Sequence, residues 1–588
     1  MYRAVLLLIL AYSTHGLQPS IAACDETNSN NSFIYCTGPI LEAVNYHKLY
    51  NDSKTFVDMP MKEEPKVVLE AFKAKFGASN SSEINRDDLQ KFIDQYFSAA
   101  GTELIQCVPA DWKEKPKKLE SIQDPQLRAW AYKLNDIWKH LCREIDPNIK
   151  QHTSRYSLLY VPNQFIAPGG RFREYYYWDA YWIIKGLIAC EMYDTTRNMI
   201  RNLALMVDKY GFVPNGGRVY YLRRSQPPLL TPMVYELYEA TNDKNFVMEM
   251  LPTLAKEYQF WNTMRTTTVN MDGKPYTVYL YRTTANLPRP ESYKEDVQKS
   301  ESLNDASRQQ FWQDIGSAAE SGWDFSSRWF SDRRTLQTIE TTRVLPVDLN
   351  GFICWNMDIL EYLYEQIGDT ANSQKFRNER ANFRDTVNAV FYNRTDGTWY
   401  DFNMNTGAHN PNFYTSTAVP LFTNCYNTLN TGKSQKVYDY MDRLGVFNYP
   451  GGIPTSMIKE THEQWDFPNG WSPNNHMIIE GLRKSANPEM QDKGFEIASK
   501  WVLGNFRVFY ETGHMWEKYD VIGTYPSPGS GGEYDVQDGF GWTNGAILDL
   551  LLTYNDRLVA PKNFSSTILS STASNLIILI FSMIFVHL

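Results

Sequence analysis

Hydrophobic side chains recur at helical spacing along the middle of the chain. One predicted helical face carries Met199, Ile200, Leu203, Met206 and Val207. A second carries Met357, Leu360, Tyr364 and Ile367, and is followed by Gly368 in the position of a C-terminal cap. A third carries Phe376, Phe383, Val387, Val390 and Phe391. The pattern predicts a mainly helical protein.

The predicted helices are joined in pairs by short turns. Two of these joints read LYEATND (237–243) and LYEQIGD (363–369), and further joints are expected at GLIACEMYD (186–194) and EGLRKSANPEM (480–490). Recurring helix–turn–helix units indicate an array of helical hairpins. If the array closes into a ring, the long segments between the hairpins meet at one end, and loops on a rigid scaffold commonly carry chemistry.

Both ends of the sequence predict targeting signals. An apolar run after Arg3, followed by small residues between 16 and 23, is typical of a secretory signal peptide, which we place at residues 1–23. The apolar tail, 576–588, is too short to span a bilayer as a helix. With the small residues at 565–567, the segment 561–588 resembles a GPI-attachment signal, and a slightly longer peptide anchor is the alternative. We expect one catalytic domain with an N-terminal extension over 24–560, located on the extracellular face of the membrane or secreted.

Glycosylation sequences and cysteines agree with a secretory route. The N-x-S/T sequences lie at Asn30, Asn51, Asn80, Asn393 and Asn563. Seven cysteines are few for 588 residues, so disulfides are not expected to be the main scaffold. Cys24 and Cys36 are near neighbours and are expected to pair. The odd number leaves at least one free thiol, for which Cys190 and Cys354 are the candidates.

Composition narrows the choice of ligand. The net charge is −9 and no basic run occurs, which argues against a nucleic-acid partner. No Cys/His metal spacing and no glycine-rich phosphate loop is present, so neither a metal nor an organic cofactor is expected. Aromatic residues reach 14%, with 38 Tyr and 16 Trp, and many of them stand beside charged residues. A neutral ligand fits this balance best.

Segments rich in both rings and charges lie between the predicted hairpins. They read PGGRFREYYYWDAYW (168–182), VPNGGRVYYLRRSQPP (213–228), LPRPES (287–292), ESGWDFSSRW (320–329), QWDFPNGWSP (464–473), MWEKYD (515–520) and GSGGEYDVQDGFGWTNG (529–545). Trp and Tyr rings pack on the apolar faces of a pyranose, while forked polar side chains bind its hydroxyls. A single Trp–acid pair is also typical of a buried ring next to a helix cap. The sequence has four such pairs, beginning at Trp178, Trp323, Trp465 and Trp516, and together they predict a sugar site.

Cleavage of a glycosidic bond requires two carboxyl groups. One protonates the leaving oxygen, and the other activates water or attacks the anomeric carbon. By chemistry alone the candidates are Asp179, Asp324, Asp466, Glu517 and Glu533, and composition does not choose among them.

Two of the segments, 168–182 and 464–473, resemble the signature stretches of the trehalases, glycoside hydrolases with an (α/α)6 barrel. The other segments match that family in order, and the similarity runs from about residue 35 to 555. The resemblance implies an all-α (α/α)6 barrel with long active-site loops at one end. It also implies hydrolysis of α,α-trehalose to two glucose molecules with inversion, Asp324 being the general acid and Glu517 the general base.

The resemblance also assigns binding residues. It places sugar-binding positions at Arg171, Trp178, Asp179, Asn215, Arg224, Gln226, Arg289, Glu291 and Gly322, and Glu533 in the loop that closes over the substrate. Inversion implies carboxyl groups about 6.5–9.5 Å apart, with room for a water molecule. We expect the pKa of Asp324 to be raised by Trp323 and other rings, and that of Glu517 to be lowered by arginines.

Two other functions remain possible at this point. Another (α/α)6 glycosidase, such as a glucoamylase-like enzyme, would share the fold and the carboxylates, and turnover of trehalose compared with maltose separates the two. A cell-surface sugar-binding protein without catalysis is the second alternative. The intact Asp324 and Glu517 argue against it.

Overall fold

The computed structural model describes residues 18–77, 79–523 and 526–561. Most of the expected signal peptide, nearly all of the expected C-terminal signal and the sequon at Asn563 therefore lie outside the described residues. Of the described sequons, Asn30, Asn51 and Asn80 are exposed and Asn393 is half-buried. No helix within these ranges is long and apolar enough to cross a membrane.

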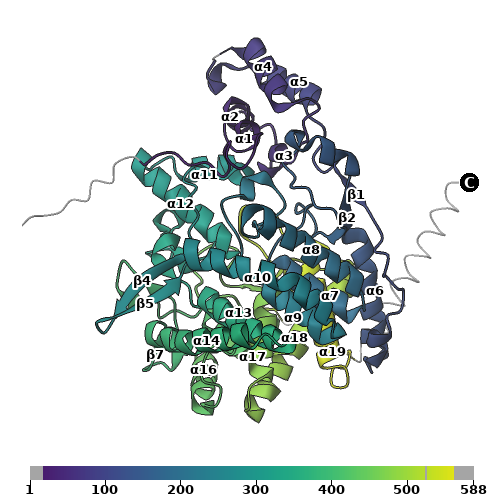
Figure 1. Ribbon diagram of the computed structural model, residues 1–588, viewed down its shortest axis with the longest axis vertical. Coiled ribbons are helices and arrows are strands. Elements are labelled where there is room, and N and C mark those ends of the chain that lie inside the picture. The colour runs from purple at the N-terminus through teal and green to yellow at the C-terminus, as the bar shows by residue number, and fades with distance from the viewer. Residues whose placement is uncertain (1–17, 78, 524–525, 562–588) are drawn as a thin grey trace, which may run out of the picture.

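Helices form the body of the protein (Figure 1), and the contacts between them define an inner and an outer layer. The inner layer contains α7 (Asp179–Ala189), α9 (Leu230–Thr241), α13 (Val347–Gln366), α15 (Val419–Phe422), α17 (Ser472–Arg483) and α19 (Gly541–Thr553). Within the described residues, each of these helices contacts the next one in this order, and α19 contacts α7, which closes the ring. The outer layer contains α6 (Pro125–Leu141), α8 (Tyr193–Tyr210), α10 (Lys244–Met264), α14 (Thr370–Val390), α16 (Thr431–Arg443) and α18 (Pro488–Thr512). The chain is an (α/α)6 barrel, as expected.

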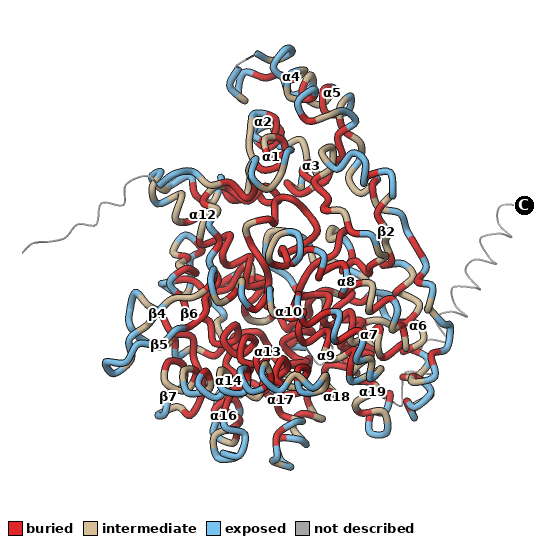
Figure 2. The backbone as a smooth tube through the Cα atoms, in the orientation of Figure 1, coloured by how far each residue is buried: buried red, intermediate tan, exposed pale blue. Residues whose placement is uncertain are grey.

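Burial explains why the inner helices show weaker periodicity than the outer ones. In α17 every residue from Ser472 to Leu482 is buried, because the helix is enclosed on all sides. The outer helix α8 buries one face, which contains the five apolar residues from Met199 to Val207 that predicted it. Figure 2 shows the same contrast, with buried chain at the centre and exposed chain at the periphery.

The ring closes where α7 meets α19. A Cβ added at Gly545 would lie 1.8 Å from the carbonyl oxygen of Trp182, and one at Gly186 would lie 2.6 Å from the Cα of Gly545. Any side chain at either glycine would push the two helices apart. All four predicted joints between helices are confirmed, and Gly368, with φ of 81°, follows α13 as expected for a C-terminal cap.

The N-terminal extension covers one end of the barrel (Figure 1). It contains α1 (Ser32–Tyr35), α2 (Pro39–Tyr46), α3 (Lys54–Val57), α4 (Pro65–Phe76) and α5 (Arg86–Tyr96), and α4 and α5 project from the body. α3 contacts the short 3-10 turn Pro290–Ser292 of the LPRPES segment. The extension therefore reaches the loops at this end of the barrel.

Short strands and two further helices shape the loops. The helices are α11 (Tyr293–Lys299) and α12 (Asp305–Ser321). One three-stranded antiparallel sheet contains β1 (Leu104–Gln106), β2 (Cys142–Ile145) and β3 (Phe165–Ile166). A second contains β6 (Val344–Leu345), β9 (Phe402–Asn403) and β10 (Ala408–His409). A third contains β11 (Asn469–Trp471), β12 (Lys518–Asp520) and β13 (Ser527–Pro528). The hairpins are β4 (Thr266–Met271) with β5 (Lys274–Tyr279), and β7 (Tyr392–Asn393) with β8 (Thr398–Trp399). The sheet β11–β12–β13 joins two of the predicted sugar segments.

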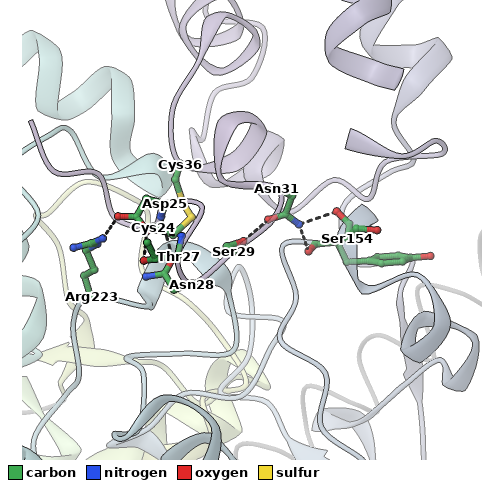
Figure 3. Close-up of a disulfide and its surroundings, with 10 residues drawn as sticks. Cys24, Asp25, Thr27, Asn28, Ser29, Asn31, Cys36, Ser154 and Arg223 are labelled. Atoms are coloured by element: carbon green, nitrogen blue, oxygen red, sulfur yellow. Dashed lines mark hydrogen bonds and ion pairs between the residues drawn. A yellow bond between two sulfur atoms is a disulfide. The ribbon is translucent and has the colours of Figure 1, made fainter. Parts of the chain in front are cut away.

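All seven cysteines lie in the described part of the chain. The expected Cys24–Cys36 disulfide is confirmed, and beside it Asp25 pairs with Arg223 of the barrel, while Asn31 donates to the carbonyl of Ser154 (Figure 3). Further disulfides join Cys107 to Cys142 and Cys354 to Cys425. Cys354 is thus not a free thiol, because α13 places it against the end of α15. The buried Cys190 is the free one.

Candidate active site

One pocket at the loop end of the barrel contains every site residue that the family resemblance assigns. The twelve residues come from segments spread over most of the chain, and they line this pocket together: Arg171, Trp178, Asp179, Asn215, Arg224, Gln226, Arg289, Glu291, Gly322, Asp324, Glu517 and Glu533. The helical barrel brings the segments together, because each of them connects or precedes barrel helices.

Two glycines form the turn that places the segment 168–182 at the pocket. Gly169 and Gly170 have φ of 130° and 57°, conformations that favour glycine. The turn places Arg171 and Trp178 on the pocket wall, and Asp179 begins the inner helix α7. The backbone N–H of Trp178 donates to the Gln226 side chain at 3.0 Å, which fixes the wall to the neighbouring segment.

Four of the aromatic residues that line the pocket are tryptophans. They are Trp178, Trp465, Trp471 and Trp542. The rings of Trp465 and Trp471 stack in parallel, with centroids 3.9 Å apart. Trp323 does not line the pocket; it stacks behind Trp465 at 5.4 Å. Trp323, the ring expected beside Asp324, therefore packs behind the tryptophans that line the pocket.

Asp324 lies just beyond the end of α12. Gly322 ends that helix with φ of 79°, and a Cβ there would lie 2.8 Å from the Trp178 ring. Within the described residues no side chain donates to the Asp324 carboxyl group, although Gln464 donates to its backbone carbonyl at 2.5 Å. Burial raises the pKa of Asp324 to about 7, and the opposing effect of Arg289 is smaller. This carboxyl group holds a proton near neutral pH and is free to donate it.

Glu517 precedes β12 and is oriented by the loop 529–545. Its carboxylate accepts a hydrogen bond from the Tyr534 hydroxyl at 3.0 Å and one from the Gln537 backbone at 3.4 Å. Burial raises its pKa above the ordinary value, and Lys518 is the largest opposing charge. The expectation of a lowered pKa is therefore wrong in direction. The two carboxyl groups still differ in their surroundings: two hydrogen bonds stabilise the charged form of Glu517, whereas no neighbouring side chain in the described part of the chain donates to Asp324.

Arg171 does lower the pKa of Glu517, but burial raises it by more, and each pocket arginine is paired with another carboxylate. Arg171 binds Asp52 through two hydrogen bonds of 2.8 Å. The other two pocket arginines bind acidic side chains as well: Arg224 pairs with Glu291, and Arg289 pairs with Asp296 and Glu533. The pocket thus contains fixed donors of little net charge, as suits a neutral ligand.

Glu533 fastens the glycine-rich loop over the pocket. Its carboxylate accepts from Arg289 at 3.1 Å, from Lys299 at 2.6 Å and from the Ser292 hydroxyl at 3.2 Å. Although burial opposes ionisation, these two cations hold the pKa of Glu533 well below its ordinary value. The loop is closed in this structure by ion pairs to the LPRPES segment and α11.

Two of the acids proposed on chemistry alone differ from the catalytic candidates. Asp466 lies outside the pocket and accepts hydrogen bonds from Ser326, Ser327, Ser456 and Thr461, so it is a structural group. Asp179 lines the pocket, and burial raises its pKa to about 8, with smaller contributions from Glu517 and Asp324.

Sequence reasoning missed other residues of this site. The pocket is also lined by Phe172, Tyr176, Tyr221, Ser292, Ala319, Tyr534 and Phe540. Most of them belong to the aromatic segments that were predicted to bind a sugar, but the sequence did not indicate which residues of those segments line the pocket. Asp52, the partner of Arg171, lies in the N-terminal extension, where no feature of the sequence indicated a role in the site.

The arrangement of a helical barrel, an aromatic wall and two differently stabilised carboxyl groups defines a glycoside hydrolase of the (α/α)6 class. The Trehalase family model matches residues 48–555. A trehalase of Homo sapiens is 41% identical over 557 residues, covering 93% of this chain and 95% of the human protein. A trehalase of Oryctolagus cuniculus is 42% identical over 530 residues, covering 90% and 91%. The chain belongs to the trehalase family.

The fold also resembles a solved structure. Neutral trehalase Nth1 from Saccharomyces cerevisiae superimposes with a TM-score of 0.53 at 21% sequence identity, covering 66% of this chain and 73% of the yeast chain. At this identity the likeness concerns the barrel. It agrees with the closed ring of helical hairpins described above.

Proposed function

We propose that this protein hydrolyses α,α-trehalose to two molecules of glucose with inversion at the attacked anomeric carbon. Asp324 is the general acid and Glu517 the general base. The observation that carries the proposal is the unequal environment of these two carboxyl groups in one pocket. Membership of the trehalase family supports the choice of substrate.

The reaction proceeds in one step. The Asp324 carboxylic acid gives its proton to the oxygen that bridges the two glucose units as the bond to the attacked anomeric carbon breaks. Glu517 removes a proton from a water molecule, whose oxygen forms the new bond to that carbon from the opposite face. The aromatic wall packs against the sugar rings, and the paired arginines donate to the hydroxyls. Return of a proton from Glu517 to Asp324 through solvent restores the enzyme.

The deciding experiment is a glucose assay on purified protein with trehalose, with maltose as the matched substrate. The proposal expects glucose from trehalose and little from maltose. A preference for maltose would indicate a glucoamylase-like specificity, and absence of turnover on both would indicate a sugar-binding protein without catalysis. Either result would refute the proposal.

We infer that the protein enters the secretory pathway and is retained at the cell surface by a GPI anchor. Three disulfides and four accessible sequons in the described chain support the secretory part of this proposal. Ile21 and Asn286 exchange hydrogen bonds of 2.6 and 2.8 Å, and Ala22 and Ala23 are buried. These contacts favour signal cleavage near Gly16, which is ahead of the approximate boundary at residue 23. N-terminal sequencing of the mature protein tests this position.

A further inference from the structure

The guanidinium group of Arg171 is held by a residue of the N-terminal extension. Asp52 accepts from the Nε and one terminal nitrogen of Arg171, each at 2.8 Å. Arg171 is 13% exposed and Asp52 35%. Such a two-point contact fixes both the position and the plane of a guanidinium group. The other terminal nitrogen makes no hydrogen bond within the described residues, and Arg171 lines the pocket.

The segment that carries Asp52 is firmly attached to the barrel. The Asp52 carboxylate also accepts from the backbone N–H of Lys54 at 2.9 Å, which fixes its side chain locally. The Lys54 side chain, 1% exposed, pairs with Asp58 at 2.5 Å and with Glu174 at 2.8 Å. Because Glu174 belongs to the same loop as Arg171, the extension and the loop share a buried ionic contact in addition to the Asp52 pair.

The held guanidinium also supports the hydrogen bond to the base. Arg171 lies over the Tyr534 ring, 4.5 Å from its centroid, and the Tyr534 hydroxyl donates to Glu517 at 3.0 Å. A shift of Arg171 would remove one side of the packing around Tyr534. The same shift would displace the terminal nitrogen of Arg171 that does not bind Asp52, in a side chain that lines the pocket.

We propose that Asp52 is a positioning residue for the reaction: by holding Arg171, it aims one nitrogen of Arg171 at the sugar and keeps Tyr534 on Glu517. This inference rests on the proposed function. It makes the N-terminal extension part of the active site, although the extension contributes no group that reacts.

The charge of Asp52 has a second consequence. Although burial opposes it, hydrogen bonding to Arg171 keeps the pKa of Asp52 below its ordinary value, so the pair is ionised and nearly neutral as a whole. Glu517 is faced by Lys518, Tyr534 and Arg171 and, across the pocket, by two carboxyl groups, those of Asp179 and Asp324. Without the Asp52 charge, the positive field of Arg171 at Glu517 increases, which favours the ionised form. Displacement of Tyr534 removes the hydrogen bond that lowers the pKa of Glu517, and this is the larger of the two effects, so the pKa of Glu517 rises.

The test compares Asp52→Asn and Asp52→Glu with the wild-type enzyme. In Asp52→Asn the new amide N–H meets an arginine N–H, so the two-point contact is lost. We expect kcat/KM for trehalose to fall roughly 10- to 100-fold, the range for misplacement by about 1 Å. The acid limb of the kcat/KM–pH profile should move to higher pH, because Glu517 loses the hydrogen bond from Tyr534. Asp52→Glu keeps the negative charge and both acceptor oxygens, so it should recover most of the lost kcat/KM.

Glu64→Gln is the matched control. Glu64 is another carboxylate of the extension, it pairs with Arg155 at 2.7 Å, and neither residue lines the pocket. This variant should stay within about threefold of wild type. Each variant at position 52 keeps the sequon at Asn51, because the middle residue is not proline, and the glycan state is checked by mass before comparison.

The outcomes separate this inference from the proposed function. A wild-type enzyme that releases no glucose from trehalose refutes the proposed function and not the role of Asp52. If the wild type is active, Asp52→Asn activity within twofold of it overturns the inference. An activity loss with an unmoved acid limb and no recovery in Asp52→Glu overturns it as well, because that pattern indicates a general structural defect.

Discussion

A methyl group added at Gly322 should disable the enzyme far more than it destabilises it. Gly322 ends α12 with φ of 79°, and a Cβ there would lie 2.8 Å from the Trp178 ring. The ring cannot retreat easily, because Trp182, Trp465 and Trp542 surround it at 5.5 to 5.8 Å between centroids. The left-handed conformation of alanine costs about 1–2 kcal/mol. The contact must then be relieved by moving Trp178 or the chain that leads to Asp324.

The expected effect of Gly322→Ala follows from that displacement. A shift of about 1 Å between reacting groups can cost roughly 100-fold in rate, equivalent to about 2.7 kcal/mol in the barrier. We therefore expect kcat/KM for trehalose to fall about 100-fold, measured by release of glucose at low substrate concentration. Thermal unfolding measured on the same preparation shows whether the protein remains folded.

Gly211→Ala is the control for the conformational cost. Gly211 caps α8 with φ of 87°, and nothing lies within 4 Å of an added Cβ. It should lose the same 1–2 kcal/mol of stability and keep kcat/KM within twofold of wild type. If Gly322→Ala retains wild-type activity, or if Gly211→Ala loses activity to the same extent, the close approach of Gly322 to Trp178 does not position the site.

Three further predictions concern the acid, the base and the anchor. Asp324→Asn or Glu517→Gln should lower kcat at least about 100-fold while substrate binding, measured by calorimetry, survives; near-normal turnover in either would contradict the assignment. In the wild type, kcat/KM should fall as pH rises through about 7, because Asp324 must be protonated, and a profile flat from pH 6 to 9 would contradict this. It should also fall on the acid side at a pH above the ordinary pKa of glutamate, because Glu517 must be ionised, and an acid limb at or below that pKa would contradict the role of Glu517. Phosphatidylinositol-specific phospholipase C should release activity from membranes, whereas recovery of the intact C-terminal tail peptide from the membrane-bound enzyme would indicate a peptide anchor.

The helical architecture could be predicted because paired helices are marked by features that lie close together in the sequence. Periodic apolar faces such as that from Met199 to Val207 and capping residues such as Gly368 are short-range signals, and the structure confirms them. The resemblance to trehalases carried the prediction from hairpins to a six-hairpin barrel. The small helices of the N-terminal extension were not predicted, because helices as short as Lys54–Val57 are stabilised by tertiary contacts rather than by their own periodicity.

The residues of the site could be predicted, but their ion pairs and pKa shifts could not all be predicted. All twelve predicted residues line one pocket, and it was the resemblance to the trehalases that selected them within segments whose chemistry suits a sugar. The pKa of Glu517 was predicted in the wrong direction, since the sequence does not show how deeply its carboxyl group is buried, and burial outweighs the nearby positive charges. The Asp52–Arg171 pair joins positions 119 residues apart, and such a contact has no local signature.

The anomeric configuration of the first products tests the central claim most directly. Both glucose units of trehalose are α-linked, and only one anomeric carbon is attacked. If Glu517 delivers water from the face opposite the leaving oxygen, the attacked unit leaves as β-glucose and the other as α-glucose. Proton NMR at early times, in buffer that slows mutarotation, should therefore show equal amounts of the two anomers. Predominantly α-glucose would indicate a retaining double displacement and would contradict the roles proposed for Asp324 and Glu517.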